Sequence, residues 1–249
     1  MKPFVLISTR PEDVIAAEEH ETHLRFTGLE PGQLHQIRLE QGPRASAQLA
    51  QLDLEQISGI FVGGSPFTTS TPAREKTEVQ NRVERDLAAL LDRVMAEGTP
   101  FFGACYGVGT LGVHQGGTVD GTYAEDVGPI EITVTEEGAR DVLLGALPST
   151  FQGYVGHQEA IRDLPPDAVL LATGTDCPVQ MFRVGERAWA TQFHPELDDI
   201  ALLSRIDAYK HHGYFRPEDA QVVRARVIDG PPVEQPRRLL ARFAEVFAR

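Results

Sequence analysis

The chain has few cysteines and few aromatic residues. Only 2 of its 249 residues are cysteine, and 7% are Phe, Trp or Tyr. Two cysteines are too few for a disulfide framework, so each is either a packing residue or a reactive thiol in a reduced setting, and we expect a cytoplasmic protein. Long hydrophobic runs are also missing, since the opening run Phe4–Ile7 is shorter than the apolar region of a signal peptide. No stretch reaches transmembrane length, so we expect no targeting segment and no membrane contact.

Positive charge is scarce. Lys and Arg number 23 against 36 Asp and Glu, a formal net charge of −13. A general basic surface for nucleic acid is therefore not expected. The sequence also has no G-x-x-x-x-G-K-[ST] loop, and His20-Glu-Thr-His23 does not have the H-E-x-x-H spacing of a metal site. We expect no cofactor and no metal, and we interpret the acidic pair Glu18-Glu19 and His20–His23 as solvated surface.

Short apolar runs alternate with longer amphipathic segments up to about residue 195, which predicts a sheet flanked by helices. A helix is expected within Arg74–Glu97, where apolar residues from Val83 to Met95 follow a 3.6-residue period. We divide the chain into an α/β domain, residues 1–197, and a helical extension packed on it, residues 198–249. The strands are expected at Phe4–Ser8, Gln33–Leu39, Gly59–Val62, Pro100–Ala104, Ile130–Val134, Val169–Thr173, Val179–Arg183 and Trp189–Phe193. The helices of the extension are expected at Leu197–His212, Pro217–Val227 and Gln235–Arg249.

Cys105 lies between a predicted strand and a helix-compatible segment, in Gly103-Ala-Cys105-Tyr-Gly107. Small residues on both sides of a nucleophile allow the strained turn of a nucleophile elbow. A thiol at a helix N-terminus is favoured as the thiolate, which is the attacking species. The alternative is a buried core cysteine.

His194 and Glu196 end another predicted strand, in Gln192-Phe-His194-Pro-Glu196. Residues two apart on an extended chain face the same side, so Glu196 can orient the imidazole. A cysteine nucleophile needs such a base, and the base needs a group that fixes its tautomer. Taken alone, a histidine before proline at a strand end is more often an ordinary loop residue.

Paired glycines, Gly63-Gly64, follow a third predicted strand. They allow backbone N–H groups to point into a site, and acyl chemistry on a thiolate needs about two such donors for its oxyanion. Our candidates are the N–H groups of Gly64 and Tyr106. A plain Gly-Gly turn is the alternative.

Together these motifs, in this order, resemble the class I glutamine amidotransferases and, among them, the glutaminase domain of GMP synthase. The resemblance covers about residues 4–196 and implies a three-layer, flavodoxin-like α/β fold with a mostly parallel sheet. It implies a Cys105-His194-Glu196 triad that hydrolyses the side-chain amide of glutamine through a thioester, with Gly64 and Tyr106 at the oxyanion hole. It also implies substrate contacts at Gly63 and Gly109, and a pocket position for His157, which lies in a segment like the family's later histidine-containing strand.

One position departs from the family pattern. Gly109 stands where the family usually has a glutamine that holds the substrate amino acid. Two alternatives to a glutaminase therefore stay open: a hydrolase of γ-glutamyl or related amides without ammonia transfer, and a non-catalytic scaffold that retains the elbow. No length remains for an ATP-using domain, so a separate synthase subunit is the expected acceptor of any ammonia.

Overall fold

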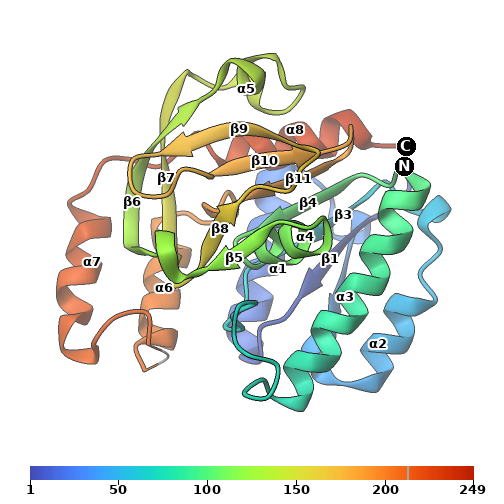
Figure 1. Cartoon of the computed structure of the whole chain (residues 1–249), viewed down its shortest axis with the longest axis horizontal. Helices are drawn as coiled ribbons and strands as arrows, with labels where there is room; N and C mark the ends of the chain where they lie inside the picture. The colour runs from blue at the N-terminus through green and yellow to red at the C-terminus, as the bar shows by residue number, and fades with distance from the viewer. Residues whose placement is uncertain (212) are drawn as a thin grey trace.

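The computed structural model describes residues 1–211 and 213–249. A mixed sheet of nine strands forms its centre, in the order β2-β1-β3-β4-β11-β10-β9-β6-β7 (Figure 1). The first five strands of that order run parallel to their neighbours, and the remaining four are joined by antiparallel pairings. The parallel strands are β1 (Phe4–Ser8), β2 (Leu34–Arg38), β3 (Gly59–Val62), β4 (Phe101–Ala104) and β11 (Ala188–Thr191). The others are β6 (Glu125–Val134), β7 (Thr150–His157), β9 (Ala168–Gly174) and β10 (Met181–Val184), and a separate pair consists of β5 (Thr118–Asp120) and β8 (Ala160–Asp163).

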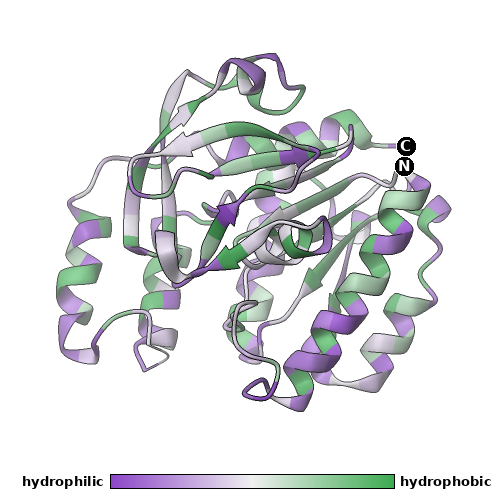
Figure 2. Ribbon diagram, viewed as in Figure 1, coloured by the Kyte–Doolittle hydropathy of each residue, from purple (hydrophilic) through white to green (hydrophobic). Residues whose placement is uncertain are grey.

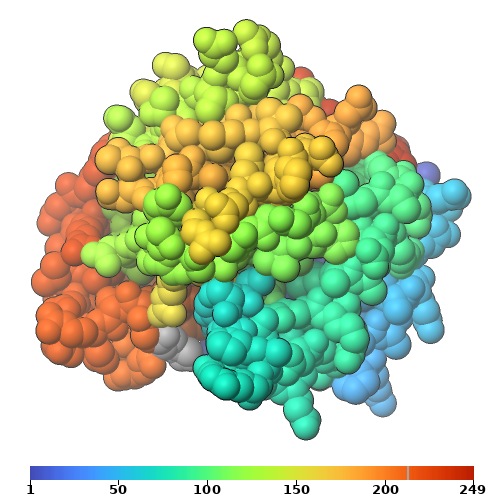
Figure 3. Space-filling view, in the orientation of Figure 1, coloured from blue at the N-terminus to red at the C-terminus, as the bar shows by residue number. Residues whose placement is uncertain are grey.

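Helices cover both faces of the parallel part of the sheet. One face carries α2 (Pro43–Ala50), α3 (Glu78–Glu97) and α4 (Tyr106–His114), and the other carries α1 (Asp13–Thr27) and α8 (Arg237–Phe247) (Figure 1). The short helix α5 (Glu136–Arg140) follows β6. The helices α6 (Asp199–Tyr209) and α7 (Ala220–Ile228) pack on one another at one end of the molecule, shown in orange in Figure 3. The expected three-layer, mostly parallel α/β fold is confirmed.

Local sequence explains why α3 forms where it does. Thr77 caps its first turn by accepting a hydrogen bond from the backbone N–H of Gln80. Val83, Leu87 and Leu90 are buried on one side of the helix, and Figure 2 shows hydrophobic and hydrophilic residues alternating around it. Gly98 ends the helix in the left-handed conformation, with φ 66°.

Three strands were not expected from periodicity: β5, β7 and β8. Their burial is set by neighbours distant in sequence, and β7 carries glycines at Gly153 and Gly156, so its own residues do not alternate cleanly. At Gly153 an added Cβ would lie 2.4 Å from the Ile132 side chain, so this strand packs too closely for a larger residue.

The C-terminal residues complete the same core. Phe243 of α8 is fully buried, and its ring lies 5.0 Å from that of Phe61 and 5.7 Å from that of Phe102. The predicted helix Leu197–His212 is shorter in the structure, since Asp198 caps α6 and the helix ends at Tyr209; residue 212 lies outside the described residues. Within the described chain, no helix combines the length and apolarity needed to cross a bilayer.

Candidate active site

Cys105 occupies a sharp bend between β4 and α4. Its φ of 51° and ψ of −90° make it the only non-glycine residue with positive φ in residues 1–211 and 213–249. The Cys105 N–H donates to the Thr191 carbonyl at 2.7 Å, which ties the bend to the end of β11. Gly103 is required beneath the bend, because a Cβ there would lie 2.8 Å from the Gly107 Cα. The strain is held by its surroundings and leaves Cys105 partly exposed at the start of a helix.

His194 lies beside Cys105 on the loop that follows β11. Its N–H donates to the Tyr154 carbonyl at 2.9 Å, and its Nδ1 lies 2.7 Å from Oε1 of Glu196. Burial alone would lower the pKa of His194, but Glu196 and Cys105, by charge and by hydrogen bonding, raise it to about 9. Burial would raise the pKa of Glu196, but His194 and Arg205 bring it well below its usual range. The neighbouring charges therefore favour an imidazolium beside the Cys105 sulfur and a carboxylate behind it.

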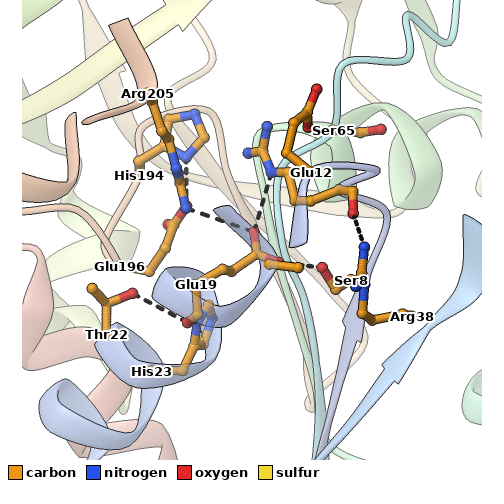
Figure 4. A network of polar contacts seen from close by, with 12 residues as sticks. Ser8, Glu12, Glu19, Thr22, His23, Arg38, Ser65, His194, Glu196 and Arg205 are labelled. Atoms are coloured by element: carbon orange, nitrogen blue, oxygen red, sulfur yellow. Dashed lines mark hydrogen bonds and ion pairs between the residues drawn. The ribbon is translucent and has the colours of Figure 1, made fainter. Parts of the chain in front are cut away.

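Behind the pair lies a buried ionic network that the motifs did not reveal (Figure 4). Arg205 of α6 donates from Nη1 to Oε1 of Glu196 at 3.0 Å, and its Nη2 lies 3.7 Å from Oε1 of Glu19. Ser8 donates to the other oxygen of Glu19 at 2.7 Å, and Arg10 donates to Oε1 at 3.4 Å. Two arginines thus balance two carboxylates that have no exposed surface.

The expectation that Glu18-Glu19 and His20–His23 form solvated surface is wrong for Glu19, Thr22 and His23, which are buried. Glu19 is 0% and His23 2% exposed, because this side of α1 faces the loops that follow β1 and β3. The Nδ1 of His23 lies 2.7 Å from the Glu19 carbonyl, and burial lowers the pKa of His23. The signal that could have identified Arg205 is its place among the apolar residues Leu202 and Ile206 on one helix.

Gly63 and Gly64 follow β3 and approach the network closely. A Cβ on Gly63 would lie 2.4 Å from Oε1 of Glu19, and the Gly63 N–H donates to the Ile7 carbonyl at 3.2 Å. A Cβ on Gly64 would lie 2.8 Å from Cε1 of His194. Gly64 therefore lies directly against His194. Gly63 packs on Glu19, and its N–H is already hydrogen-bonded to a backbone carbonyl.

Gly109 faces a loop that fills the space beside it. A Cβ there would lie 2.4 Å from Oγ1 of Thr69 and 3.5 Å from Oε1 of Glu159. Glu159 accepts from the N–H groups of Thr69 and Ser70, each at 2.6 Å, and so holds this loop over α4. A longer side chain at position 109 has no room while Thr69 stays in place.

His157 ends β7 and lines a small cavity together with Cys105 and Gly109. Its Nδ1 lies 3.0 Å from the Glu159 carbonyl and its Nε2 lies 2.9 Å from Oε2 of Glu125. The ligand atoms of Glu125, His157 and Cys177 lie within 4.8 Å of one another, which makes these residues the metal-ligand candidates in the described chain. Each already has a protein partner, because the Cys177 thiol donates to the Val179 carbonyl at 3.5 Å. Burial raises the pKa of Cys177 to about 12.

Two cavities meet at Cys105. The first, of about 50 Å³, is lined by Cys105 and His194 together with residues of α6. The second, of about 40 Å³, is lined by Cys105, Tyr106 and Gly109 but not by His194. A thiol between two cavities, with an imidazole on one side, is an arrangement suited to acyl transfer.

The sheet thus presents a cysteine on the strand–helix bend after β4, and a histidine–carboxylate pair on the loop that follows the neighbouring strand β11. The model of the family "Glutamine amidotransferase class-I" matches residues 35–199. The chain therefore belongs to the class I glutamine amidotransferase family, as its motifs indicated.

Relatives of known sequence and structure agree with this. The chain is 31% identical over 147 residues to GMP synthase [glutamine-hydrolyzing] of Porphyromonas gingivalis, a match that covers 58% of this chain and 26% of the relative. It is 27% identical over 155 residues to the GMP synthase of Yersinia enterocolitica, covering 60% of this chain and 27% of that protein. The chain thus spans about a quarter of the length of these relatives.

Solved structures show the same fold at low identity. A glutamine amidotransferase of Thermotoga maritima superposes with a TM-score of 0.69 at 18% identity, covering 98% of this chain and 99% of that one. A glutamine amidotransferase of Methylobacillus flagellatus gives a TM-score of 0.69 at 16% identity, covering 100% and 96%. These likenesses extend over the C-terminal helices, which the family model does not reach.

Proposed function

We propose that this protein hydrolyses the side-chain amide of glutamine to glutamate and ammonia, with Cys105 as nucleophile, His194 as base and then acid, and Glu196 as its orienting partner. The observation that carries the proposal is the placement of Cys105 and His194 on one cavity, with His194 hydrogen-bonded to Glu196 at 2.7 Å. Family membership supports the chemistry.

In the first half of the reaction, the Cys105 sulfur attacks the amide carbon of glutamine while its proton is held on His194. The carbonyl oxygen becomes an oxyanion, which the backbone N–H groups of Gly64 and Tyr106 stabilise; one such donor contributes on the order of 3 kcal/mol to the barrier. Tyr106 is the first residue of α4, where backbone N–H groups have no partner within the helix. The C–N bond then breaks as His194 gives its proton to the leaving nitrogen.

In the second half, water attacks the glutamyl thioester. His194 takes a proton from the water, a second oxyanion forms at the same site, and Cys105 leaves as glutamate is released. The raised pKa of His194, about 9, keeps its proton available for the leaving group at neutral pH. Gly63, Gly109 and His157 lie near the substrate in this proposal, with Glu159 providing the carboxylate nearest to position 109.

The ammonia would pass to a separate synthase subunit. The named relatives are glutamine-hydrolysing GMP synthases about four times as long as the matched segment, so their matched part is only one portion of each protein. A γ-glutamyl amide hydrolase and a non-catalytic scaffold remain the alternatives.

A glutamine-analogue electrophile separates the enzyme from the scaffold. We expect stoichiometric labelling in the wild type and in Cys177→Ser, and none in Cys105→Ser, measured by intact mass and peptide mapping. Ammonia release from glutamine is expected to follow the same pattern. A thiol at position 105 that stays inert between about pH 6 and 9, a window around the ordinary thiol pKa of about 8.5, would instead favour the scaffold.

A further inference from the structure

The cavity on the His194 side of Cys105, which we term the side chamber, has walls unlike those of the cavity beside Tyr106. Apolar side chains make up most of its wall, and they are Val127, Val155, Leu197, Leu202, Ile206 and Phe215. Its volume is about 50 Å³. A single water needs about 10–15 Å³ by the same measure, so the chamber has room for roughly three to five water molecules, or for a short carbon chain.

The position of the side chamber indicates which part of a substrate it would hold. In the proposed reaction the acyl group lies toward the oxyanion donor Tyr106, whereas the leaving nitrogen must lie toward the imidazole that protonates it. The second cavity contains Tyr106 and Gly109 but not His194, and the side chamber contains His194 but neither of those residues. The chamber is therefore on the leaving-group side of the sulfur.

The charges around the chamber favour an uncharged occupant. Arg10 and Arg205 both line it, and both are buried. Glu19 balances Arg10, and Glu196 with Glu19 balances Arg205. Because both guanidinium groups already have carboxylate partners, a cationic occupant of the chamber is disfavoured. An acidic occupant would compete with those carboxylates for the guanidinium groups.

Part of the wall lies beyond the segment that the family model matches. Leu202, Ile206 and Phe215 all follow residue 199, where the family match ends. Tyr214 fastens this segment over the site by donating to the Ser65 carbonyl at 3.2 Å. A small ammonia molecule does not require an apolar wall of this extent, but an N-alkyl group does.

We propose that the preferred substrates are γ-glutamyl amides whose nitrogen carries a short uncharged alkyl group, which lies in the side chamber. This rests on the thiol chemistry of the proposed function and develops its γ-glutamyl amide alternative, in which an alkylamine leaves in place of ammonia. Cys105 sulfur bonds to the γ-carbonyl carbon and the C–N bond breaks; the alkylamine departs with the proton from His194, and water then converts the thioester to glutamate and the thiol.

The test is a substrate series: glutamine and the N-methyl, N-ethyl, N-propyl and N-hexyl amides of the γ-carboxyl. Along the secondary amides we expect kcat/KM to rise about fourfold for each added carbon up to propyl, as expected for burial of a CH₂ group, and to fall at hexyl. If kcat/KM stays constant or falls from the methyl to the propyl amide while glutamine is hydrolysed efficiently, the inference is overturned and the glutaminase proposal remains intact.

Two substitutions at Ile206, on the chamber wall, have a matched control at Ile200, which is 77% exposed on the same helix. Ile206→Phe fills the chamber and is expected to abolish the preference for the propyl amide. Ile206→Ala should move the optimum to a longer chain. Ile200→Phe should resemble the wild type. If Ile206→Ala leaves the optimum unchanged, the chamber does not hold the leaving group.

Binding to the Cys105→Ala variant, measured by calorimetry, separates this inference from catalysis. Affinity is expected to increase from the methyl to the propyl amide even though no hydrolysis occurs. If the wild type hydrolyses nothing but this gradient is present, the proposed function fails and the chamber assignment holds. If the affinities show no gradient, the chamber assignment fails.

Discussion

At the scale of single residues, the site depends on how buried charges are paired. Glu196 Oε1 is shared by His194 at 2.7 Å and Arg205 at 3.0 Å. The carboxylate raises the pKa of the imidazole, and the guanidinium limits how much uncompensated negative charge the imidazole faces. One oxygen thus links the proposed base to the C-terminal part of the chain.

The pKa of His194 gives the first prediction. We expect kcat/KM for glutamine to fall above about pH 9, where His194 loses the proton it donates to the leaving nitrogen. In Glu196→Gln this fall should move to lower pH, because the strongest contribution that raises the pKa is removed. Profiles of kcat/KM against pH measure both effects. Glu21→Gln, a substitution at an exposed position of α1, is the control and should leave the profile unchanged.

The same pKa links protonation to folding. Since the folded value of about 9 exceeds the ordinary 6.5, the imidazolium form is favoured in the folded state. Its contribution to the free energy of unfolding is complete below about pH 6.5 and is lost as the pH rises through 9. The free energy of unfolding, measured by urea titration, should therefore fall less between pH 6.5 and 9.5 in His194→Gln than in the wild type.

Arg205 provides the second prediction. Arg205→Met leaves Glu196 and Glu19 buried with one cation fewer, so we expect a loss of about 3–5 kcal/mol in the free energy of unfolding. The control is Arg224→Met, whose ion pair with Asp207 is 27% and 66% exposed, and it should cost no more than about 1 kcal/mol. Equal losses in urea denaturation would contradict the role of the buried network. Arg205→Lys, which retains the charge, should recover part of the loss.

At the scale of elements, the strand–helix bend is the device that presents the thiol. β4, β11 and β3 are adjacent and parallel, so their carboxyl ends bring together Cys105, His194 and Gly64. Ligand sites of open parallel sheets lie outside these ends for the same reason.

The third prediction concerns this bend. Gly103→Ala places a Cβ 2.8 Å from the Gly107 Cα, which is backbone and cannot move aside cheaply. We expect a destabilisation of about 1–3 kcal/mol together with reduced labelling of Cys105. Gly32→Ala, where the added Cβ meets no heavy atom within 4 Å, is the control and should stay within about 0.5 kcal/mol of wild type. Thermal unfolding and electrophile labelling test both effects, and unchanged labelling in folded Gly103→Ala would show that the bend tolerates a methyl group.

At the scale of the whole molecule, the C-terminal helices are part of the architecture. α8 supplies aromatic and aliphatic side chains to the core on one face of the sheet, α6 supplies Arg205 to the site, and both pack beside α1. Tyr154 of β7 donates to Asp199 of α6 at 2.7 Å, which joins the antiparallel part of the sheet to the same helix.

The fourth prediction tests this integration. Phe243→Ala removes a fully buried ring from among Phe4, Phe61 and Trp189, and we expect a loss of about 3–5 kcal/mol. Ile228→Ala, at a side chain 62% exposed on α7, should change the free energy of unfolding by less than about 0.5 kcal/mol. A small effect of Phe243→Ala in urea denaturation would mean that residues 198–249 are an appendage and not part of the core.

Much of the fold and part of the candidate site could be predicted from local sequence. The parallel strands and α3 follow from apolar runs and periodicity, and the elbow glycines and the His194-Pro-Glu196 segment marked residues that the fold does bring to one edge. These features are encoded by neighbours in the chain, so local physics suffices for them.

Only the tertiary structure decided the rest. Glu19, Arg10 and Arg205 look like surface charges in sequence, because nothing local shows that each one's compensating partner comes from a different element. The loop over Gly109 and the side chamber likewise arise where distant segments meet. Backbone preference and hydrophobic pattern are properties of short stretches, whereas burial and charge compensation are properties of what those stretches pack against.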